Sequence, residues 1–431
     1  MNSLRPRYRI AMVAACPFPS LRGSQVLIRE LAEALVAAGH EVHVVTYPAG
    51  EHVVPVRGFR IHRTRGCGGL DGSRSWWAKL VLDVALIATL YRVVRDHAID
   101  VIHAHNYEGP LVSYAVRWML GTPVVYHSHN VMSDELPYYF TGSIARWIAR
   151  RVGRALDRVV PRCADYCVAL SPEIARFLIH RGVAGNRIAV VPPAIALPSK
   201  REIENGGMLF PDNDVVLYAG NIDPYQNMET LLRAFAHVRQ KRPNTVLVIA
   251  AHVATAPTTR RRLVTIAAIP GVVVAESRSF RSTRTILERA DVVVCPRSSW
   301  SGFPIKLLNF MSFGKAIVVC KSVAKVVQDG HTGVVVPDRD EWAMAAAITG
   351  LLEDCAQRTA LGIAARQAVA MHHTWAALLP RIESLYAETV GRPNGFEAVE
   401  KQGGRVRRIG LMAPAEDRIS PRASTRRTGN E

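Results

Sequence analysis

The chain has 431 residues, which is too long for one ordinary hydrophobic core, so we expect two domains. Hydrophobic residues make up 49% of it, which indicates a globular chain, and a formal net charge of +18 favours polyanions such as nucleic acid, anionic membrane or phosphorylated substrates. The seven cysteines are scattered without a CxxC pair, which argues against a disulfide framework or a zinc site.

The first half alternates short apolar runs with helical patterns. It opens on a strand, YRIAMVAA, then a loop, CPFPSLRGS, and a helix, QVLIRELAEALVAAGHEV. Later runs read as strands (HEVHVVTY, DVIHAH, PVVYHSH, YCVALS, NRIAVVPPAI) and as helices (EGPLVSYAVRWML, PEIARFLIHRGV). Strands that alternate with helices predict a parallel sheet covered on both faces.

Two segments bear on membrane targeting. The start, MNSLRPRYRIAMVAAC, has too short an apolar core for a signal peptide. In WWAKLVLDVALIATLYRVV, Lys79 and Asp83 interrupt the apolar run, which is far below the roughly 20 residues that span a bilayer. We therefore expect a core helix there, with an interfacial helix as the alternative, no spanning helix, and a cytoplasmic protein.

The same alternation restarts after a polar segment. Residues 199–213 read as a linker, and VVLYAG, TVLVIAA, GVVVAES, DVVVCP, AIVVCK and GVVVP read as strands of a second sheet. We expect an N-terminal domain over residues 1–198, a second domain over 214–374, a last helix over 375–391, and a disordered basic tail over 392–431. Two doubly wound sheets place a ligand cleft at the carboxyl ends of their strands.

The order of several motifs resembles glycosyltransferase family 4, the retaining enzymes with the GT-B fold. The similarity covers roughly residues 8 to 391 and rests on these stretches: PFPSLRGSQVLIRELAEALVAAGHEVHVVT, VIHAHN, PVVYHSHN, VLYAGNIDPYQNMETLLRAF, ADVVVCPR, GFPIKLLNFMSFGKAIVV and DGHTGVVVP. The resemblance implies two Rossmann-like domains, a nucleotide-sugar donor held by the second domain, an acceptor held by the first, and no required metal or other cofactor. It also implies that the helix from about Trp375 crosses back to the first domain.

The acceptor side of the predicted site lies in the first domain. Gly23, in a loop where the family usually has paired glycines, could let the backbone approach a phosphate or the acceptor, and we expect it to contribute to donor binding from this domain. His127 and His129 share one face of a strand, and alternation alone does not choose between them. The resemblance matches His129 to a family histidine on the acceptor side, which implies that His129 is the catalytic residue. We also expect His105, Asp134 and Glu135 to help bind the acceptor.

The donor side departs from the family pattern. Asn221 and Gln226 stand where the family typically has arginine and lysine on the donor diphosphate, and a neutral amide donates a weaker hydrogen bond. Ser301 and Asn309 stand where the family has two glutamates, one on the transferred sugar and one on the ribose. Asn309 could still bond a ribose diol.

The turn between those two positions is retained. It comprises Gly302, Phe303, Pro304 and Ile305, whose N–H groups could cradle a diphosphate. Lys306 follows it, in a first helical turn that disfavours a cation unless an anion is bound there. We therefore expect Lys306 to contact the donor phosphates.

The helix SIARWIARRVGRALDRVV has arginines at positions 146, 150, 154 and 158 and an apolar row along its other side. Two interpretations stay open. The helix could be an ordinary surface helix whose apolar row packs in the core, or it could bind peripherally to the inner face of an anionic membrane. No specific nucleic-acid recognition motif is found.

These features predict a retaining glycosyltransferase of cell-envelope polysaccharide, lipid or glycoconjugate synthesis, with a sugar or lipid-linked acceptor. Two alternatives remain: a degenerate nucleotide-sugar-binding protein, because four donor positions are altered, and a nucleotide-sugar epimerase of similar fold. A Rossmann oxidoreductase is disfavoured because no GxGxxG follows the first strand.

Overall fold

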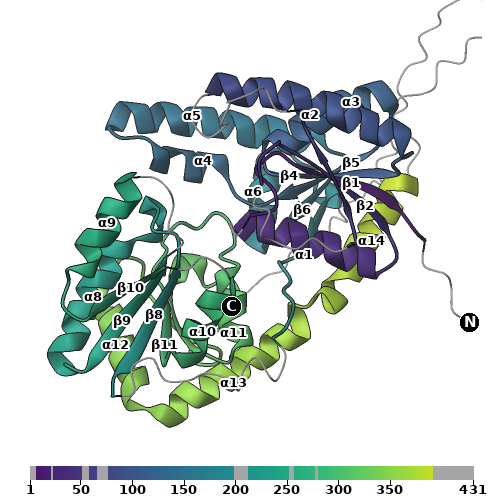
Figure 1. Cartoon of the computed structure of the whole chain (residues 1–431). Coiled ribbons are helices and arrows are strands. Elements are labelled where there is room, and N and C mark those ends of the chain that lie inside the picture. Colours follow the sequence, from purple (N-terminus) through teal and green to yellow (C-terminus); the bar gives the residue numbers. More distant parts are fainter. Residues whose placement is uncertain are drawn as a thin grey trace, which may run out of the picture. The chain divides into compact units, whose positions relative to one another are not determined.

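The computed structural model describes residues 6–20, 23–50, 58–65, 76–198, 212–251, 257–276 and 280–391. Within these ranges the strands form two parallel sheets (Figure 1). Most of the expected linker and all of the expected basic tail lie outside the described residues.

The first sheet has seven strands in the order β3-β2-β1-β4-β5-β6-β7. Every neighbouring pair is parallel, and the strands β1, β4 and β5 are buried along almost their whole length. Continuous burial explains why these strands read as unbroken apolar runs. The bounds are β1 Arg9–Ala14, β2 Glu41–Thr46, β3 Arg60–Arg63, β4 Val101–His105, β5 Val124–Ser128, β6 Tyr166–Ala169 and β7 Ile188–Val190.

Helices cover both faces of this sheet: α2 and α3 lie on one face, and α1 and α14 lie on the other (Figure 1). The bounds are α1 Gly23–Ala37, α2 Trp76–Asp96, α3 Glu108–Leu120, α4 Met132–Glu135, α5 Ser143–Val159, α6 Pro172–His180 and α14 Trp375–Gly391. Helix α2 buries Leu82, Leu86, Leu90 and Val93, which recur at helical spacing, so it is the core helix that its sequence predicts.

The second sheet has six strands in the order β10-β9-β8-β11-β12-β13, again all parallel. Its strands are β8 Asp214–Gly220, β9 Thr245–Ala251, β10 Val272–Glu276, β11 Val292–Cys295, β12 Ala316–Cys320 and β13 Val334–Val336. Its helices are α8 Met228–Lys241, α9 Pro257–Ala267, α10 Phe280–Arg289, α11 Lys306–Ser312, α12 Glu341–Glu353 and α13 Cys355–His372. The chain thus forms two Rossmann-like domains, as predicted.

The end of the described chain returns to the first sheet. Thr374 forms a parallel bridge with Ile195, and the Ile195 N–H donates to the His373 carbonyl at 2.9 Å. Helix α14 then packs against α1, β4 and β5. The last helix therefore contributes to the core of the first domain and not to that of the second.

The sequence analysis missed several elements, of which β3 and α13 are the most informative. The four-residue edge strand β3 is too short to show alternation, and the 18-residue helix α13 is rich in alanine with a weak apolar stripe. In the part of the chain that the structure describes, no helix combines the length and apolarity that crossing a bilayer requires.

Candidate active site

Four histidines form a stacked row at the carboxyl ends of β4 and β5. His103 and His105 lie on β4, His127 lies on β5, and His129 follows it. The ring centroids of His103 and His105 are 4.6 Å apart, and those of His127 and His129 are 4.9 Å apart. The alternation of side chains along two neighbouring parallel strands puts all four on one face.

The row is held by hydrogen bonds between ring nitrogens. His105 Nδ1 lies 3.1 Å from His129 Nε2, and His103 Nε2 lies 3.1 Å from His127 Nδ1. The hydroxyl of Tyr386, on α14, bonds His103 Nδ1 at 2.6 Å. The last helix therefore fixes one end of the row, a role that no sequence motif indicated.

All four imidazoles are kept neutral. Burial lowers the pKa of His129 to about 4 and that of His103 to about 3, and it lowers the pKa values of His105 and His127 well below the usual value. His129 is 8% exposed, whereas His105 is fully buried. His105 therefore reaches the site only through its bond to His129.

Asp134 and Glu135 lie on the short helix α4, whose start is held by a buried carboxylate. Asp157, on α5, is 1% exposed and accepts from the N–H groups of Met132 and Ser133 at 2.9 and 3.0 Å. A carboxylate that satisfies the first N–H groups of a helix fixes its start. Asp157 is thus a positioning residue that the sequence analysis missed.

Ser301 lies where the resemblance led us to seek a glutamate, and its loop binds a carboxylate from elsewhere. The Asp134 Oδ2 atom accepts from the Ser299 hydroxyl at 2.8 Å and from the Ser301 N–H at 3.3 Å. Ser301 itself is fully buried. Position 301 therefore lacks the carboxylate of the family glutamate, but the carboxylate of Asp134 lies beside it.

Lys306, Gln226 and Asn221, three of the predicted donor residues, form one hydrogen-bonded chain. Lys306 Nζ donates to Gln226 Oε1 at 3.1 Å, and Gln226 Nε2 donates to Asn221 Oδ1 at 2.8 Å. The Lys306 ammonium also lies 4.4 Å from the centroid of the Tyr218 ring. Burial, and then the charge of Arg297, lower the pKa of Lys306.

Arg297 is a second cation of this region that the sequence analysis missed, although it follows the apolar strand DVVVC at the place where ligand-binding residues gather. Its guanidinium lies 4.9 Å from the centroid of the Tyr225 ring and donates to the Ser301 carbonyl. Its Nε–H is buried without a hydrogen-bond acceptor among the described residues. A buried donor without a partner indicates that a ligand could supply one.

The turn between Ser301 and Lys306 is shaped by Gly302. Its φ of +74° favours glycine, and a Cβ there would lie 3.2 Å from the Arg297 guanidinium. Phe303 and Pro304 are buried and Ile305 is half-buried. Asn309 is half-buried on α11, one turn beyond Lys306. Gly23, by contrast, begins α1 and is exposed.

Two hollows adjoin these residues. The larger, of about 310 Å³, is lined by Tyr138, Tyr225, Asn227, Ser298 and Arg339 together with neighbours on α8 and α12. The smaller, of about 190 Å³, is lined by Ser133, Asp134, Arg150, Arg154, Arg181 and Trp300. Three arginines in so small a hollow suit an anionic group.

Comparisons with known proteins agree on one kind of activity. Residues 22–194 match the model of the glycosyl transferase 4-like domain, and residues 213–354 match that of the glycosyl transferases group 1. A D-inositol 3-phosphate glycosyltransferase of Pseudarthrobacter chlorophenolicus is 27% identical over 374 residues, which are 80% of this chain and 85% of that protein.

Solved structures of low sequence identity share the fold. Sucrose-phosphate synthase from Thermosynechococcus elongatus superposes with a TM-score of 0.74 at 20% identity, over 89% of this chain and 99% of that one. HepE from Anabaena, solved in complex with UDP and glucose, superposes with a TM-score of 0.68 at 17% identity, over 88% of this chain and the whole of that one.

Proposed function

Because the chain belongs to glycosyltransferase family 4 and has the GT-B fold, we propose that it transfers a sugar from a nucleoside diphosphate sugar to an acceptor hydroxyl with retention, and without a metal. One arrangement carries the proposal: the second domain holds two cations that have no acidic partner among the described residues, and the first holds a row of neutral imidazoles. The products would serve cell-envelope polysaccharide, lipid or glycoconjugate synthesis.

The donor diphosphate is the counter-ion that Lys306 and Arg297 lack. Neither side chain has an ion pair among the described residues, and each lies against a tyrosine ring instead. A partly buried cation without a carboxylate is costly to the free protein. Binding a diphosphate would offset that cost and would satisfy the buried Nε–H of Arg297.

The reaction itself needs a stabilised leaving group and a place for one proton. The bond from the anomeric carbon to the donor phosphate breaks, and its electron pair leaves on the phosphate oxygen that Lys306 and Arg297 neutralise. The acceptor oxygen bonds the same face of the sugar and passes its proton to that phosphate. His129, held neutral, donates or accepts a hydrogen bond at a hydroxyl near the reacting carbon.

An anionic acceptor fits the smaller hollow. Arg150, Arg154 and Arg181 line it beside Asp134, and the Asp134 carboxylate could accept from an acceptor hydroxyl. Several relatives are named D-inositol 3-phosphate glycosyltransferases, a name that contains a phosphorylated compound. For the present chain we propose a phosphorylated acceptor, either a sugar or a lipid-linked sugar.

Helix α5 favours peripheral contact with an anionic membrane. Its apolar row does not lie wholly in the core, because Ile144 is 75% exposed, and Ile148 and Val152 are half exposed. The helix packs instead through small residues: a Cβ on Gly153 would lie 2.6 Å from the Met132 carbonyl. Exposed Trp147 lies among exposed arginines, an arrangement that suits an interfacial helix.

The membrane contact is tested by vesicle sedimentation at low salt. One variant changes Arg146, Arg151 and Arg158 to glutamine and should lose about 3 kcal/mol of attraction to anionic lipid. A second variant, Trp147→Ser with Ile148→Ser, removes apolar contact with the membrane. Both variants leave Arg150 and Arg154 in place. The matched control, Ile363→Ser with Met371→Ser, changes two exposed apolar residues of α13. If the wild type, both α5 variants and the control sediment equally, α5 does not bind the membrane.

The transferase proposal is tested by a screen of nucleotide-sugars against phosphorylated and lipid-linked acceptors, with and without a chelator. We expect a new glycosidic product whose anomeric configuration, read by NMR, matches that of the donor, at a rate that the chelator leaves unchanged. Product without an acceptor would indicate the epimerase. Donor binding without any product would indicate a degenerate binding protein.

A further inference from the structure

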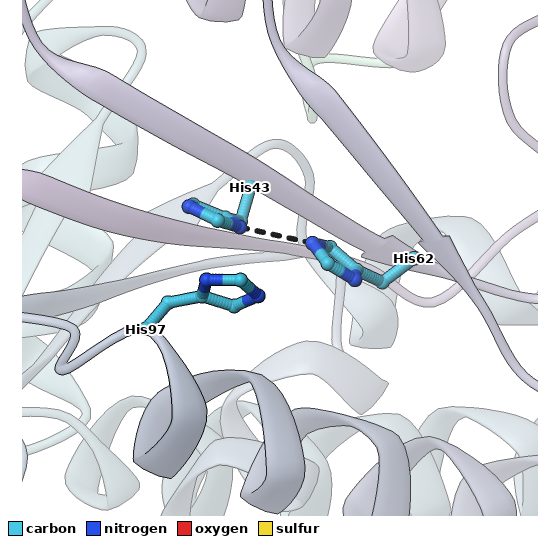
Figure 2. Close-up of side chains that lie close together, drawn as sticks. All are labelled: His43, His62 and His97. Carbon is cyan, nitrogen blue, oxygen red and sulfur yellow. Dashed lines mark hydrogen bonds between the residues drawn. The ribbon is translucent and has the colours of Figure 1, made fainter.

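Three histidines from three separate elements converge near the edge of the first sheet (Figure 2). His43 is on β2, His62 is on the edge strand β3, and His97 follows the last residue of α2. One ring nitrogen from each lies within 4.8 Å of the other two. None of these residues takes part in the site described above.

The topology makes the convergence specific. His62 is the register partner of Val45, two residues beyond His43 on β2, so the two imidazoles lie on one face of the sheet. Helix α2 packs against β2 and delivers His97 to that face. His43 Nδ1 lies 2.9 Å from His62 Nε2, and the rings of His43 and His97 have centroids 4.2 Å apart.

The spacing suits a transition metal. Zinc binds imidazole nitrogen at about 2.0–2.1 Å, so two ligands of a tetrahedral site lie about 3.3 Å apart. The separation of His43 Nδ1 and His62 Nε2 is close to this value. Small rotations of the half-buried His62 and His97 would bring the third nitrogen into range.

Neighbouring charges support the same arrangement. Glu41 Oε1 lies 3.1 Å from His43 Nε2, so a proton on Nε2 leaves the Nδ1 lone pair directed at the other two histidines. A carboxylate behind a ligating histidine is the usual outer partner in zinc sites. The carboxyl end of α2, where His97 lies, also favours a cation.

We propose that His43, His62 and His97 bind a zinc ion, with a water molecule as fourth ligand, and that Glu41 positions His43. The ion fastens the edge strand β3 and the end of α2 to β2. Its role is structural, because His43 aligns through β1 with Ile102, the neighbour of His103, so the cluster faces the opposite side of the sheet from the histidine row.

The test uses the full chain, stripped of metal with a chelator and titrated calorimetrically with zinc chloride. We expect one zinc per chain, and a weakening of at least a hundredfold in the double variant His62→Gln with His97→Gln. Both positions are half-buried, so circular dichroism checks that the variant folds. The matched control, His180→Gln with His331→Gln, also removes two histidines but from exposed positions, and should bind zinc like the wild type.

Two further measurements separate a metal site from a hydrogen-bonded histidine cluster. Glu41→Gln should weaken zinc binding by about 10- to 100-fold, as loss of an outer carboxylate does. Zinc should raise the melting temperature of the wild type and of the control but not of the His62/His97 variant. The transfer rate well below the melting temperature should not respond to zinc.

The proposal is overturned if metal-free protein does not bind zinc, or if the His62/His97 variant binds it as the wild type does. The second result would place the ion elsewhere in the chain. Loss of binding in the control as well would show that the effect is not specific to this cluster and would equally overturn it.

Discussion

The two Rossmann-like domains concentrate different polar groups at the carboxyl ends of their strands. The first presents a row of buried imidazoles whose pKa values are all lowered by burial. The second presents Lys306 and Arg297, each against a tyrosine ring. Burial removes the charge of a histidine, whereas it only lowers the pKa of a lysine and leaves an arginine charged. One fold thus builds a neutral hydrogen-bonding surface and a cationic one.

The largest expected effect is on the transfer rate, when a histidine of the neutral row in the first domain is replaced. His129→Ala should reduce the transfer rate by about a hundredfold or more, since it removes a preorganised hydrogen bond at the reacting centre. Donor affinity should stay near the wild-type value, because the cations lie in the other domain. Steady-state kinetics and donor titration measure the two quantities.

An exposed histidine provides the control for that experiment. His331→Gln lies outside both sites and should leave the kinetics unchanged. If folded His129→Ala transfers sugar at the wild-type rate, the imidazole row does not face the acceptor, and the contrast between the domains is structural only.

The next effect tests the cationic side. Lys306→Ala should weaken nucleoside diphosphate binding by roughly tenfold to a hundredfold, since a hydrogen bond to a charged group contributes about 1.5–3 kcal/mol. Nucleoside binding should hardly change, because Asn309 could hold the ribose. Calorimetric titration with a nucleoside and its diphosphate measures both, with exposed Lys321→Ala as the control.

Intact diphosphate affinity in Lys306→Ala would mean that the lysine binds only Gln226 and the Tyr218 ring. The stretch from Ser301 to Asn309 would then be a remnant of a donor site. Equal losses for nucleoside and diphosphate would indicate a general disturbance of the domain and not a lost phosphate contact.

Acidification should lower the stability of the first domain, which holds the row of neutral histidines. The folded-state pKa of His129, about 4, lies below the ordinary value of 6.5, so the unfolded chain binds more protons between these values. The free energy of unfolding is therefore highest above pH 6.5 and decreases as the pH falls toward 4. Between pH 7 and pH 5, one such histidine should lower the free energy of unfolding by about 2 kcal/mol.

Urea denaturation of the wild type and of His129→Gln at both pH values isolates this contribution. The variant should lose less stability on acidification, by about the amount of one histidine. Parallel losses in the two proteins would mean that His129 is not held neutral by burial.

The smallest effect concerns the second cation. Arg297→Gln should weaken diphosphate binding by about tenfold, and Arg297→Lys by less, because lysine keeps the charge and loses the planar guanidinium that stacks on Tyr225. If both variants bind like the wild type, Arg297 serves only to hold the Ser301 carbonyl.

The sequence by itself determined the pattern of alternating strands and helices, because buried parallel strands are continuously apolar and their helices amphipathic. It also placed His129, Lys306, Asn221 and Gln226 near strand ends or in the turns beside them. The strand and helix pattern is a local property, read from neighbours along the chain, whereas these four residues were chosen through the resemblance to the family.

Only the tertiary structure decided which distant groups meet. It joined Tyr386 to His103 across 283 positions, set Asp134 beside Ser301, and brought His43, His62 and His97 together. It also decided which face of α5 packs, since Gly153 allows the backbone of α4 to approach and leaves Ile144 and Ile148 exposed. Such contacts depend on strand order and helix packing, and no local periodicity encodes them.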